Sequence, residues 1–436
     1  MSKHLFKALR LAFFISLLAG ALTSLSVNAA NQSVKVLHVK GTIVPIVADY
    51  IDRGISQAEE ENATACIIEL NTPGGLLEPT EKIVERILNA RVPVIVYVSP
   101  KGAWAASAGT FITLSGHVAA MMPGTTIGAA HPVSAGGEEI PEEQMKKITE
   151  FSAKWMETIA QERGRNIEEA KLAVTESKSF TDVDALENNL IDLRAEDIAT
   201  LLAEINGQLV TLAGGEEVIL ETENYVLDRT EMTFVERFLQ TISHPNIAYI
   251  LLSVGSLGII AEIYSPGALF PGITGAICLL LAFYALNVLD AFWGGILLII
   301  LAFGLFVGEA LTATFGLFTA GGVAALVLGS LILFPGQPAM FQVDPWLIAV
   351  VVLLVTGIVA FVMQRVIQAH RRQAKTGREE LAGKTAVVKQ DLDPEGLVFF
   401  KGERWAAVAD KGRIKAGEEV IITEVDGLIL RVTKKQ

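Results

Sequence analysis

The 436-residue sequence predicts three structural classes in succession: an α/β domain, a helical domain that crosses a membrane several times, and a small all-β domain. Apolar strands alternate with helical segments over 33–206. Long apolar stretches follow over 246–366, and short strands punctuated by glycine fill 382–436. The chain is 51% hydrophobic and only 19% charged, which excludes a wholly soluble protein of this length.

The N-terminus has the pattern of a secretory signal peptide. Lys3, Lys7 and Arg10 precede an apolar run over 11–27, and small residues follow that run. A basic segment, an apolar segment and a small-residue cleavage site together define such a signal. We therefore expect removal of 1–29, with an uncleaved anchor as the alternative, and a following domain that begins outside the cytoplasm.

Residues 30–206 are expected to form the α/β domain. Apolar strands separated by helical segments are typical of parallel βαβ units with a buried sheet. Working groups in such sheets gather at the carboxyl ends of the strands. Two segments fall there: the Thr-Pro-Gly-Gly turn that ends at Gly75, and a small-residue helix predicted over 103–115, which carries Ser107.

Ser107 is the candidate nucleophile. Small residues flank it and a Gly-Gly turn lies upstream, an arrangement with which some folds present a nucleophile beside an oxyanion hole. A serine hydroxyl needs a neighbour that accepts its proton. By sequence, His131 is the obvious candidate base, 24 residues after Ser107.

Three ordered segments resemble the protease domain of the long-form NfeD membrane proteins, members of the Clp protease/crotonase superfamily. They are Asn-Thr-Pro-Gly-Gly at 71–75, Ala-Ala-Ser-Ala-Gly-Thr at 105–110 and Pro-Gly-Thr-Thr-Ile-Gly-Ala at 123–129. The similarity continues through 248–267 and into Gly-Glu-Arg-Trp at 402–405, so it covers essentially the whole mature chain. It implies a Clp protease/crotonase-like α/β domain in a membrane-bound serine protease.

The resemblance implies a serine–lysine dyad, as in signal peptide peptidases. The family's lysine precedes Ile-Thr at the entrance to a helix that ends in Gln-Glu-x-Gly-Arg-Asn, and Lys147 is the residue that matches. Ser107 is then the nucleophile and Lys147 the base. The matching oxyanion donors are the backbone amides of Gly75, or Gly74, and of Ala108.

His131 remains the alternative base. Soluble Clp-type peptidases use a histidine near this position together with an aspartate, but the matching segment here holds Ser177 and Lys178, with Glu176 only loosely placed. A histidine without an orienting acid loses the group that fixes its tautomer and stabilises the imidazolium. Adjacent lysines at a helix start are by themselves ordinary surface charge, so it is the resemblance to the family that favours Lys147 over His131.

A lysine acts as a base at neutral pH only when it is desolvated. The stretch 133–144 immediately precedes Lys147 and has no clear regular structure before Pro141. We hypothesise that this stretch holds Lys147 away from Ser107 until a substrate orders it.

Five apolar stretches over 246–366 each have roughly the length of a bilayer core, at about 1.5 Å per residue. An amphipathic stretch over 234–242 precedes them and is expected on the outer membrane face. Five spans that begin outside end in the cytoplasm, and the basic residues after the last span also mark a cytoplasmic flank. Glu262 and Glu309 fall at span ends, where interface caps are the first interpretation and proton carriers the alternative.

Residues 382–436 are predicted to form five short strands and resemble the OB-type barrel that ends NfeD proteins. Some OB barrels bind nucleic acid, but the net charge of −13 and the few aromatic residues, Phe399, Phe400 and Trp405, argue against it. The family association is with stomatin/flotillin-type membrane scaffolds, so we expect contact with such a protein.

Neither a cofactor nor a metal is implied. The sequence has no phosphate-binding loop and no zinc motif. Its two cysteines, Cys66 and Cys278, are expected in a buried strand and in a membrane span, so they cannot form a disulfide.

Together these expectations describe a serine endopeptidase of the bacterial inner membrane that cleaves apolar segments of membrane-associated proteins. Its protease domain is expected outside the cytoplasm and its C-terminal domain inside, and the superfamily implies a homo-oligomer. The competing hypothesis is a non-catalytic scaffold that binds peptides and organises a stomatin-like partner. The predicted division is signal peptide 1–29, protease domain 30–206, connector 207–245, membrane domain 246–366, basic linker 367–381 and OB-type domain 382–436.

Overall fold

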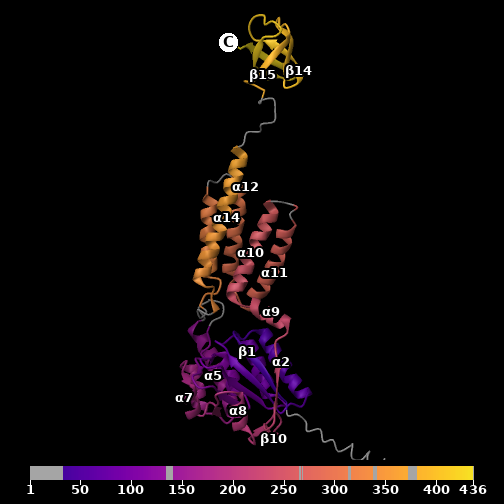
Figure 1. Cartoon of the computed structure of the whole chain (residues 1–436). Helices are drawn as coiled ribbons and strands as arrows, with labels where there is room; N and C mark the ends of the chain where they lie inside the picture. Colours follow the sequence, from indigo (N-terminus) through magenta and orange to yellow (C-terminus); the bar gives the residue numbers. More distant parts are fainter. Residues whose placement is uncertain are drawn as a thin grey trace, which may run out of the picture. The chain divides into compact units, whose positions relative to one another are not determined.

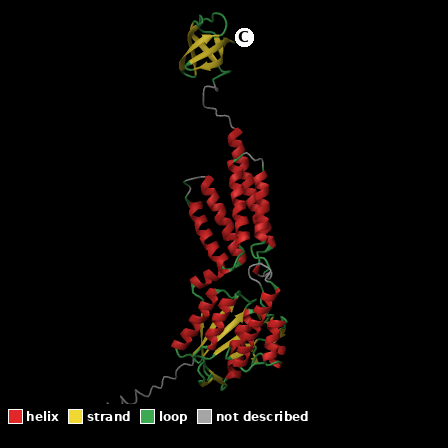
Figure 2. Cartoon of the chain, turned by 180° about the vertical axis from the view of Figure 1, so that it is seen from behind, coloured by secondary structure: helices red, strands yellow, loops and turns green. Residues whose placement is uncertain are grey.

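The computed structural model describes residues 33–133, 141–264, 267, 269–312, 316–336, 341–371 and 381–435 (Figure 1). The predicted signal peptide lies outside these residues, as does most of the predicted basic linker. Within them, mixed helix and strand give way to helix alone and then to strand alone (Figure 2). The predicted fold class is therefore confirmed.

The α/β domain is built on a six-stranded sheet in the order β11-β1-β2-β3-β5-β8, in which neighbouring strands run parallel. Its strands are β1 (Ser33–Lys40), β2 (Ala65–Asn71), β3 (Val94–Val98), β5 (Val118–Met121), β8 (Leu193–Arg194) and β11 (Val226–Thr230). All five residues of β3 are buried. The unbroken apolar runs of the sequence thus become the interior of a sheet that is covered on both faces.

Helices cover the two faces of this sheet with separate apolar cores. One core takes side chains from α2 (Pro45–Glu60), α3 (Leu77–Leu88), α4 (Ala108–Ser115), α5 (Glu142–Glu162), α6 (Ile167–Thr175) and α7 (Asp182–Glu187). The other core lies against α8 (Ile198–Ile205).

A second, three-stranded sheet carries the segment around Ser107. Its strands are β4 (Trp104–Ala106), β6 (Thr126–Gly128) and β7 (Ser179–Thr181), in the order β4-β6-β7. The single helix predicted over 103–115 is wrong, because Ala105 pairs with both Thr72 and Ile127 and so extends this part as a strand. Ser107 is therefore the junction between a strand and a helix.

The stretch predicted as a connector contributes to the α/β domain. It forms the hairpin of β9 (Leu209–Thr211) and β10 (Glu217–Ile219), then β11 at the edge of the main sheet, then α9 (Phe234–Ile242). The buried ammonium of Lys35 in β1 pairs with Asp228 of β11 and with Glu61, which fixes that edge. Arg53 of α2 pairs with Glu236 of α9 at 2.7 Å, which attaches α9 to the domain.

Five apolar helices follow: α10 (Pro245–Tyr264), α11 (Phe270–Val288), α12 (Trp293–Leu311), α13 (Leu317–Leu331) and α14 (Pro345–Arg371). Among the described residues, α10, α11 and α14 are long and apolar enough to cross a membrane, whereas the qualifying parts of α12 and α13 are shorter. The five-span topology and the orientation derived from it therefore stay predictions.

The two membrane carboxylates hold backbone groups at loops. Glu309 of α12 accepts hydrogen bonds from the N–H groups of Gly316, at 2.8 Å, and Thr319, at 2.9 Å, at the start of α13. Glu262 of α10 accepts one from Gly267 at 3.1 Å. The contacts of Glu309 favour the cap interpretation over a proton carrier, because carboxylates suit the unpaired N–H groups of a helix start. Glu262 bonds a loop N–H instead, and its Oε2 is buried without a partner among the described residues.

The C-terminal strands close into a small barrel in the order β12-β13-β14-β16-β15. They are β12 (Thr385–Gln390), β13 (Glu395–Phe400), β14 (Glu403–Ala409), β15 (Glu419–Asp426) and β16 (Ile429–Lys434). The barrel has its own apolar core, in which Phe400 is buried and against which Trp405 packs, while Phe399 is exposed. The five predicted strands are all present.

Candidate active site

The peptide backbone at Ser107 is strained. Ser107 is half-buried and has φ 51° and ψ −114°, a conformation that residues other than glycine rarely adopt. Its N–H donates to the carbonyl of Gly128 at 2.9 Å, and its own carbonyl accepts from Thr110 N–H at 2.9 Å. Such strain, of about 1–3 kcal/mol, persists only where the surroundings impose it, and it is frequent at functional sites.

Thr110 is the residue that imposes this conformation. Its buried hydroxyl accepts a hydrogen bond from Gly128 N–H at 2.9 Å and lies 3.0 Å from the carbonyls of Ala105 and Gly128. One side chain thus ties α4 to β4 and β6 on either side of Ser107. Thr110 is the only residue with a hydroxyl group in the first turn of α4, and no pattern in the sequence singled it out.

The Gly-Gly turn lies directly against Ser107. Gly74 has φ 117°, and a Cβ added there would lie 2.8 Å from the Cβ of Ser107 and 3.3 Å from its Oγ. Only glycine permits both this conformation and this approach. The turn is held on its other side by Ile43, whose N–H donates to Gly74 O at 2.9 Å and whose carbonyl accepts from Leu76 N–H at 2.9 Å.

The backbone amides of this turn differ in their availability. Gly74 N–H donates to the hydroxyl of the buried Thr72 at 3.0 Å, so it is already engaged. Within the described part of the chain, neither Gly75 N–H nor Ala108 N–H has a hydrogen-bond partner. Of the donors named from the sequence, Gly75 and Ala108 are therefore the two available ones.

Lys147 lies on the first turns of α5 and is exposed. Its ammonium pairs with Glu143, one helical turn earlier, at 3.1 Å, and 71% of its side chain is accessible to solvent. Among the described residues it makes no hydrogen bond with Ser107, whose hydroxyl has no partner of its own. The structure therefore does not bring the predicted dyad together, and 134–140, within the stretch hypothesised to hold Lys147 away, lie outside the described residues.

His131 caps a helix. Its Nδ1 lies 2.9 Å from the carbonyl of Val174, in the last turn of α6, and Ala130 N–H donates to Ala173 O at 2.8 Å beside it. Because Nδ1 must donate to that carbonyl, the neutral ring leaves Nε2 as its acceptor. A backbone carbonyl thus occupies the place where a triad would have its carboxylate, and His131 makes no described contact with Ser107.

The helices that carry Ser107 and Lys147 are joined away from the site. Phe111 of α4 stacks on Trp155 of α5, with ring centroids 4.6 Å apart. Arg165, only 5% exposed, donates to the carbonyls of Leu114, at 3.1 Å, and Gly116, at 3.0 Å, at the end of α4. These contacts give the Gln-Glu-x-Gly-Arg-Asn segment a physical role: it fixes the end of α5 to the end of α4.

Within the described residues, no cluster of histidine, cysteine and carboxylate side chains could hold a metal ion. Both cysteines are free thiols, and burial raises the pKa of Cys66 to about 12, so it is no candidate nucleophile. The described site therefore offers a hydroxyl group and two backbone amides. A base must be brought to it from elsewhere in the chain.

Three family models match consecutive parts of the chain. They are the NfeD1b N-terminal domain over 33–211, the NfeD integral membrane domain over 246–365, and the NfeD-like C-terminal, partner-binding domain over 378–434.

Two relatives match along almost their whole length. The membrane-bound protease PH1510 of Pyrococcus horikoshii is 38% identical over 418 residues, which cover 93% of this chain and 94% of that protein. The membrane protein NfeD1b of Bacillus subtilis is 25% identical over 446 residues, which cover 97% of each. A solved structure of a membrane-bound stomatin-specific protease, a lysine-to-alanine mutant in complex with a substrate peptide, is 38% identical and covers 49% of this chain and 98% of its own, with a TM-score of 0.46.

Proposed function

The chain belongs to the NfeD family of membrane proteins, and we propose that it is a membrane-anchored serine endopeptidase. In this proposal Ser107 attacks the peptide carbonyl, and Lys147 accepts the proton and returns it to the leaving amine. The amides of Gly75 and Ala108 bind the oxyanion. The name of the relative at 38% identity, a membrane-bound protease, supports peptide-bond hydrolysis.

The observation that carries the proposal is the junction at Ser107. A half-buried serine with a positive φ lies against a glycine turn, and its hydroxyl has no partner among the described residues. Two unpaired amides, of Gly75 and Ala108, belong to the same two turns. A nucleophile and two converging donors are what acyl transfer requires.

The proposal requires Lys147 to change its surroundings. Its ammonium is exposed to solvent and pairs with Glu143 at 3.1 Å, whereas a lysine that acts as a base must be desolvated and lie beside the serine. We propose that a bound peptide covers the start of α5, breaks this pair and desolvates the ammonium group. Catalysis would then be coupled to substrate binding, and the protease would be inactive until a suitable peptide is bound.

An apolar substrate fits the exposed side chains near Ser107. Trp104, three residues before Ser107, is 47% exposed, and Leu77, two residues after Gly75, is 49% exposed. Exposed apolar side chains in the segments that carry the site favour apolar peptide segments. The C-terminal barrel, which matches a partner-binding domain, would hold a stomatin- or flotillin-type membrane protein, and the α/β domain would act outside the cytoplasm as a homo-oligomer.

One observation favours the competing function. Because Lys147 is exposed and paired with Glu143, no base forms a hydrogen bond with Ser107 among the residues that the structure describes. A protein that only binds peptides and organises a stomatin-like partner would need none. The two functions differ in whether the protein cleaves the peptide that it binds, with Ser107 and Lys147 required for the cleavage.

Alanine variants test the proposal in the full-length protein, with an apolar peptide as substrate. We expect Ser107→Ala and Lys147→Ala each to lower kcat by about 10³-fold or more while peptide binding persists. Lys146→Ala, an exposed lysine on the same turn, is the matched control and should keep full activity. Unchanged cleavage in both site variants would reject the dyad, and a comparable loss in His131→Gln with an active Lys147→Ala would transfer the base to His131.

A further inference from the structure

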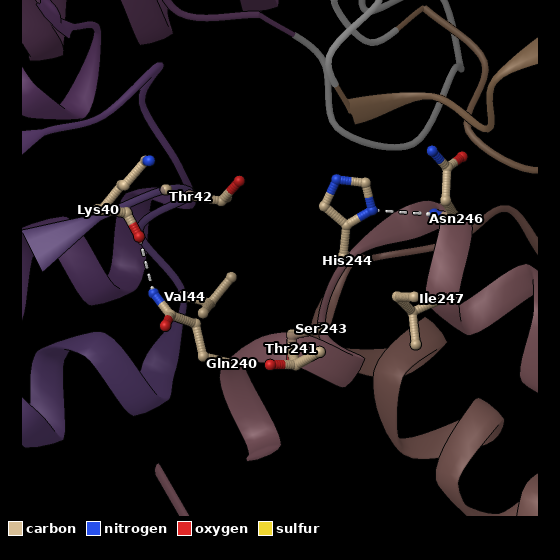
Figure 3. Close-up of a pocket in the computed structure, with 10 residues that line it drawn as sticks. Lys40, Thr42, Val44, Gln240, Thr241, Ser243, His244, Asn246 and Ile247 are labelled. Carbon is tan, nitrogen blue, oxygen red and sulfur yellow. Dashed lines mark hydrogen bonds between the residues drawn. The ribbon is translucent and has the colours of Figure 1, made fainter. Parts of the chain in front are cut away.

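A pocket of ≈ 450 Å³ lies where the α/β domain meets the first membrane helix (Figure 3). Its walls come from the turn after β1, at 40–44, and from the segment 240–247, which joins α9 to α10. Gln240 holds the two walls together, because its side-chain amide donates to the carbonyl of Lys40 at 3.0 Å. The volume falls within the range of small-molecule sites.

Three hydrogen-bond donors of this pocket are free. Among the described residues, the ammonium of Lys40 has no ion-pair partner and the hydroxyl of Thr42 makes no hydrogen bond. His244 accepts the N–H of Asn246 on Nδ1 at 3.2 Å, which places the proton of the neutral ring on Nε2. His244 remains exposed to solvent, but partial desolvation of its ring lowers its pKa and so favours this neutral, donating form.

The charge of the pocket is opposite to that of the chain. No aspartate or glutamate is among its lining residues, although the whole chain has a net charge of −13. An ammonium with two neutral donors and no carboxylate is suited to a phosphate group. The lining thus favours a monoanionic phosphate ester over a cation or a neutral ligand.

The pocket lies at the start of the first helix that is long enough to cross a membrane. α10, the first helix long enough to cross a membrane, begins at Pro245, and Ile247 already forms part of the pocket wall together with Val44. The start of α14 is tied to the same level, because Asp344 N–H donates to the side chain of Asn246 at 2.8 Å. Exposed Trp346 follows, and tryptophan is enriched at membrane–water interfaces.

We propose that this pocket binds the phosphate headgroup of an anionic phospholipid. Lys40, Thr42 and His244 contact the phosphate, and Val44 and Ile247 contact the first carbons of the glycerol and acyl region. A free phosphate ion would use the same three donors and leave the apolar wall without a partner. The occupant is therefore a lipid of the outer leaflet in the predicted topology.

The same turn supports the candidate oxyanion site. Ile43, between the lining residues Thr42 and Val44, bonds to both sides of the Gly74 turn, and Gly41 N–H donates to Asn71 O at 3.0 Å. A headgroup that fixes 40–44 therefore also fixes the turn that approaches Ser107. This consequence for activity rests on the proposed function, whereas the lipid site itself does not.

Lipid retention by the full-length protein tests the site directly. The protein is purified from nanodiscs that contain equal amounts of phosphatidylglycerol and phosphatidylcholine, and the retained lipid is measured by native mass spectrometry. We expect preferential retention of phosphatidylglycerol, which Lys40→Gln lowers about fivefold. Lys101→Gln, an exposed lysine elsewhere on the α/β domain, is the matched control and should retain the lipid as the wild type does.

Two outcomes would overturn the proposal. Equal retention by the wild type and the double variant Lys40→Gln, His244→Gln would exclude the pocket, and displacement of the lipid by inorganic phosphate alone would make it an ion site. Ser107→Ala should retain phosphatidylglycerol normally, so a failed protease proposal leaves this result unchanged. If phosphatidylglycerol increases peptide cleavage by the wild type but not by Lys40→Gln, the lipid pocket is coupled to the protease site.

Discussion

Replacing Gly74 by alanine should disable the candidate site and leave the fold intact. The φ of 117° at Gly74 costs an alanine about 1–2 kcal/mol, and the new Cβ would lie 2.8 Å from the Cβ of Ser107. Carbon atoms do not approach this closely, so either the turn or the serine must move. Because a misplacement of about 1 Å costs about 10²-fold in rate, we expect kcat for peptide cleavage to fall about 10²-fold.

Gly102→Ala is the matched control for this prediction. Gly102 also has a positive φ, 84°, but an added Cβ would meet nothing within 4 Å. Both variants therefore have the conformational cost, and only Gly74→Ala has the contact with Ser107. The assay combines peptide cleavage with urea unfolding of the full-length protein in detergent. Equal activity of the two variants at equal stability would refute the inference that Gly74 positions Ser107.

Two further predictions concern the end of α4. Burial, with the nearby Arg163 guanidinium, lowers the pKa of His117 from 6.5 to about 3. Between these two pH values the histidine is protonated in the unfolded chain and neutral in the folded chain. The free energy of unfolding should therefore fall as the pH drops through this window, by roughly 2 kcal/mol at pH 5. Urea unfolding should show this loss in the wild type and not in His117→Asn. An equal loss in both proteins would contradict the assignment to His117. Arg165→Met removes the donor to the carbonyls of Leu114, in α4, and Gly116, just after it, and also removes the ion-pair partner of Asp192. We expect it to destabilise the α/β domain by about 3 kcal/mol or more. Arg237→Met, at an exposed ion pair, should change the stability by less than about 1 kcal/mol. Similar losses in the two arginine variants would show that the contacts at the end of α4 do not stabilise the domain.

Local patterns in the sequence were sufficient for the fold class. The buried strands, the long apolar helices and the five strands of the barrel each follow from the period or length of apolar runs. The strand β4 was not predictable in this way. Two of its three residues are alanines, which favour a helix, and the strand forms because Thr72 and Ile127, both distant in sequence, pair with Ala105. Long-range pairing here overrides local propensity.

The placement of β11 has the same cause. Its residues follow a hairpin and read as part of a connector, yet they add an edge to the main sheet beside β1. The buried Lys35 explains why: its ammonium needs a carboxylate, and Asp228 of β11 supplies one. No local pattern could show that a charge in the first strand has its partner near the end of the domain.

The sequence by itself determined which residues are candidates: Ser107, the glycine turn, Lys147 and His131 are all visible as residue types in a recognisable order. Only the tertiary structure decided their states. It placed the Gly74 turn against a strained Ser107, engaged Gly74 N–H with Thr72 and, within the described residues, left the amides of Gly75 and Ala108 without a partner. It also bonded His131 to the end of α6 and left Lys147 in solvent with Glu143. The physical reason is that a residue's chemistry is local, whereas its solvation and hydrogen-bond partners depend on segments that only folding brings together.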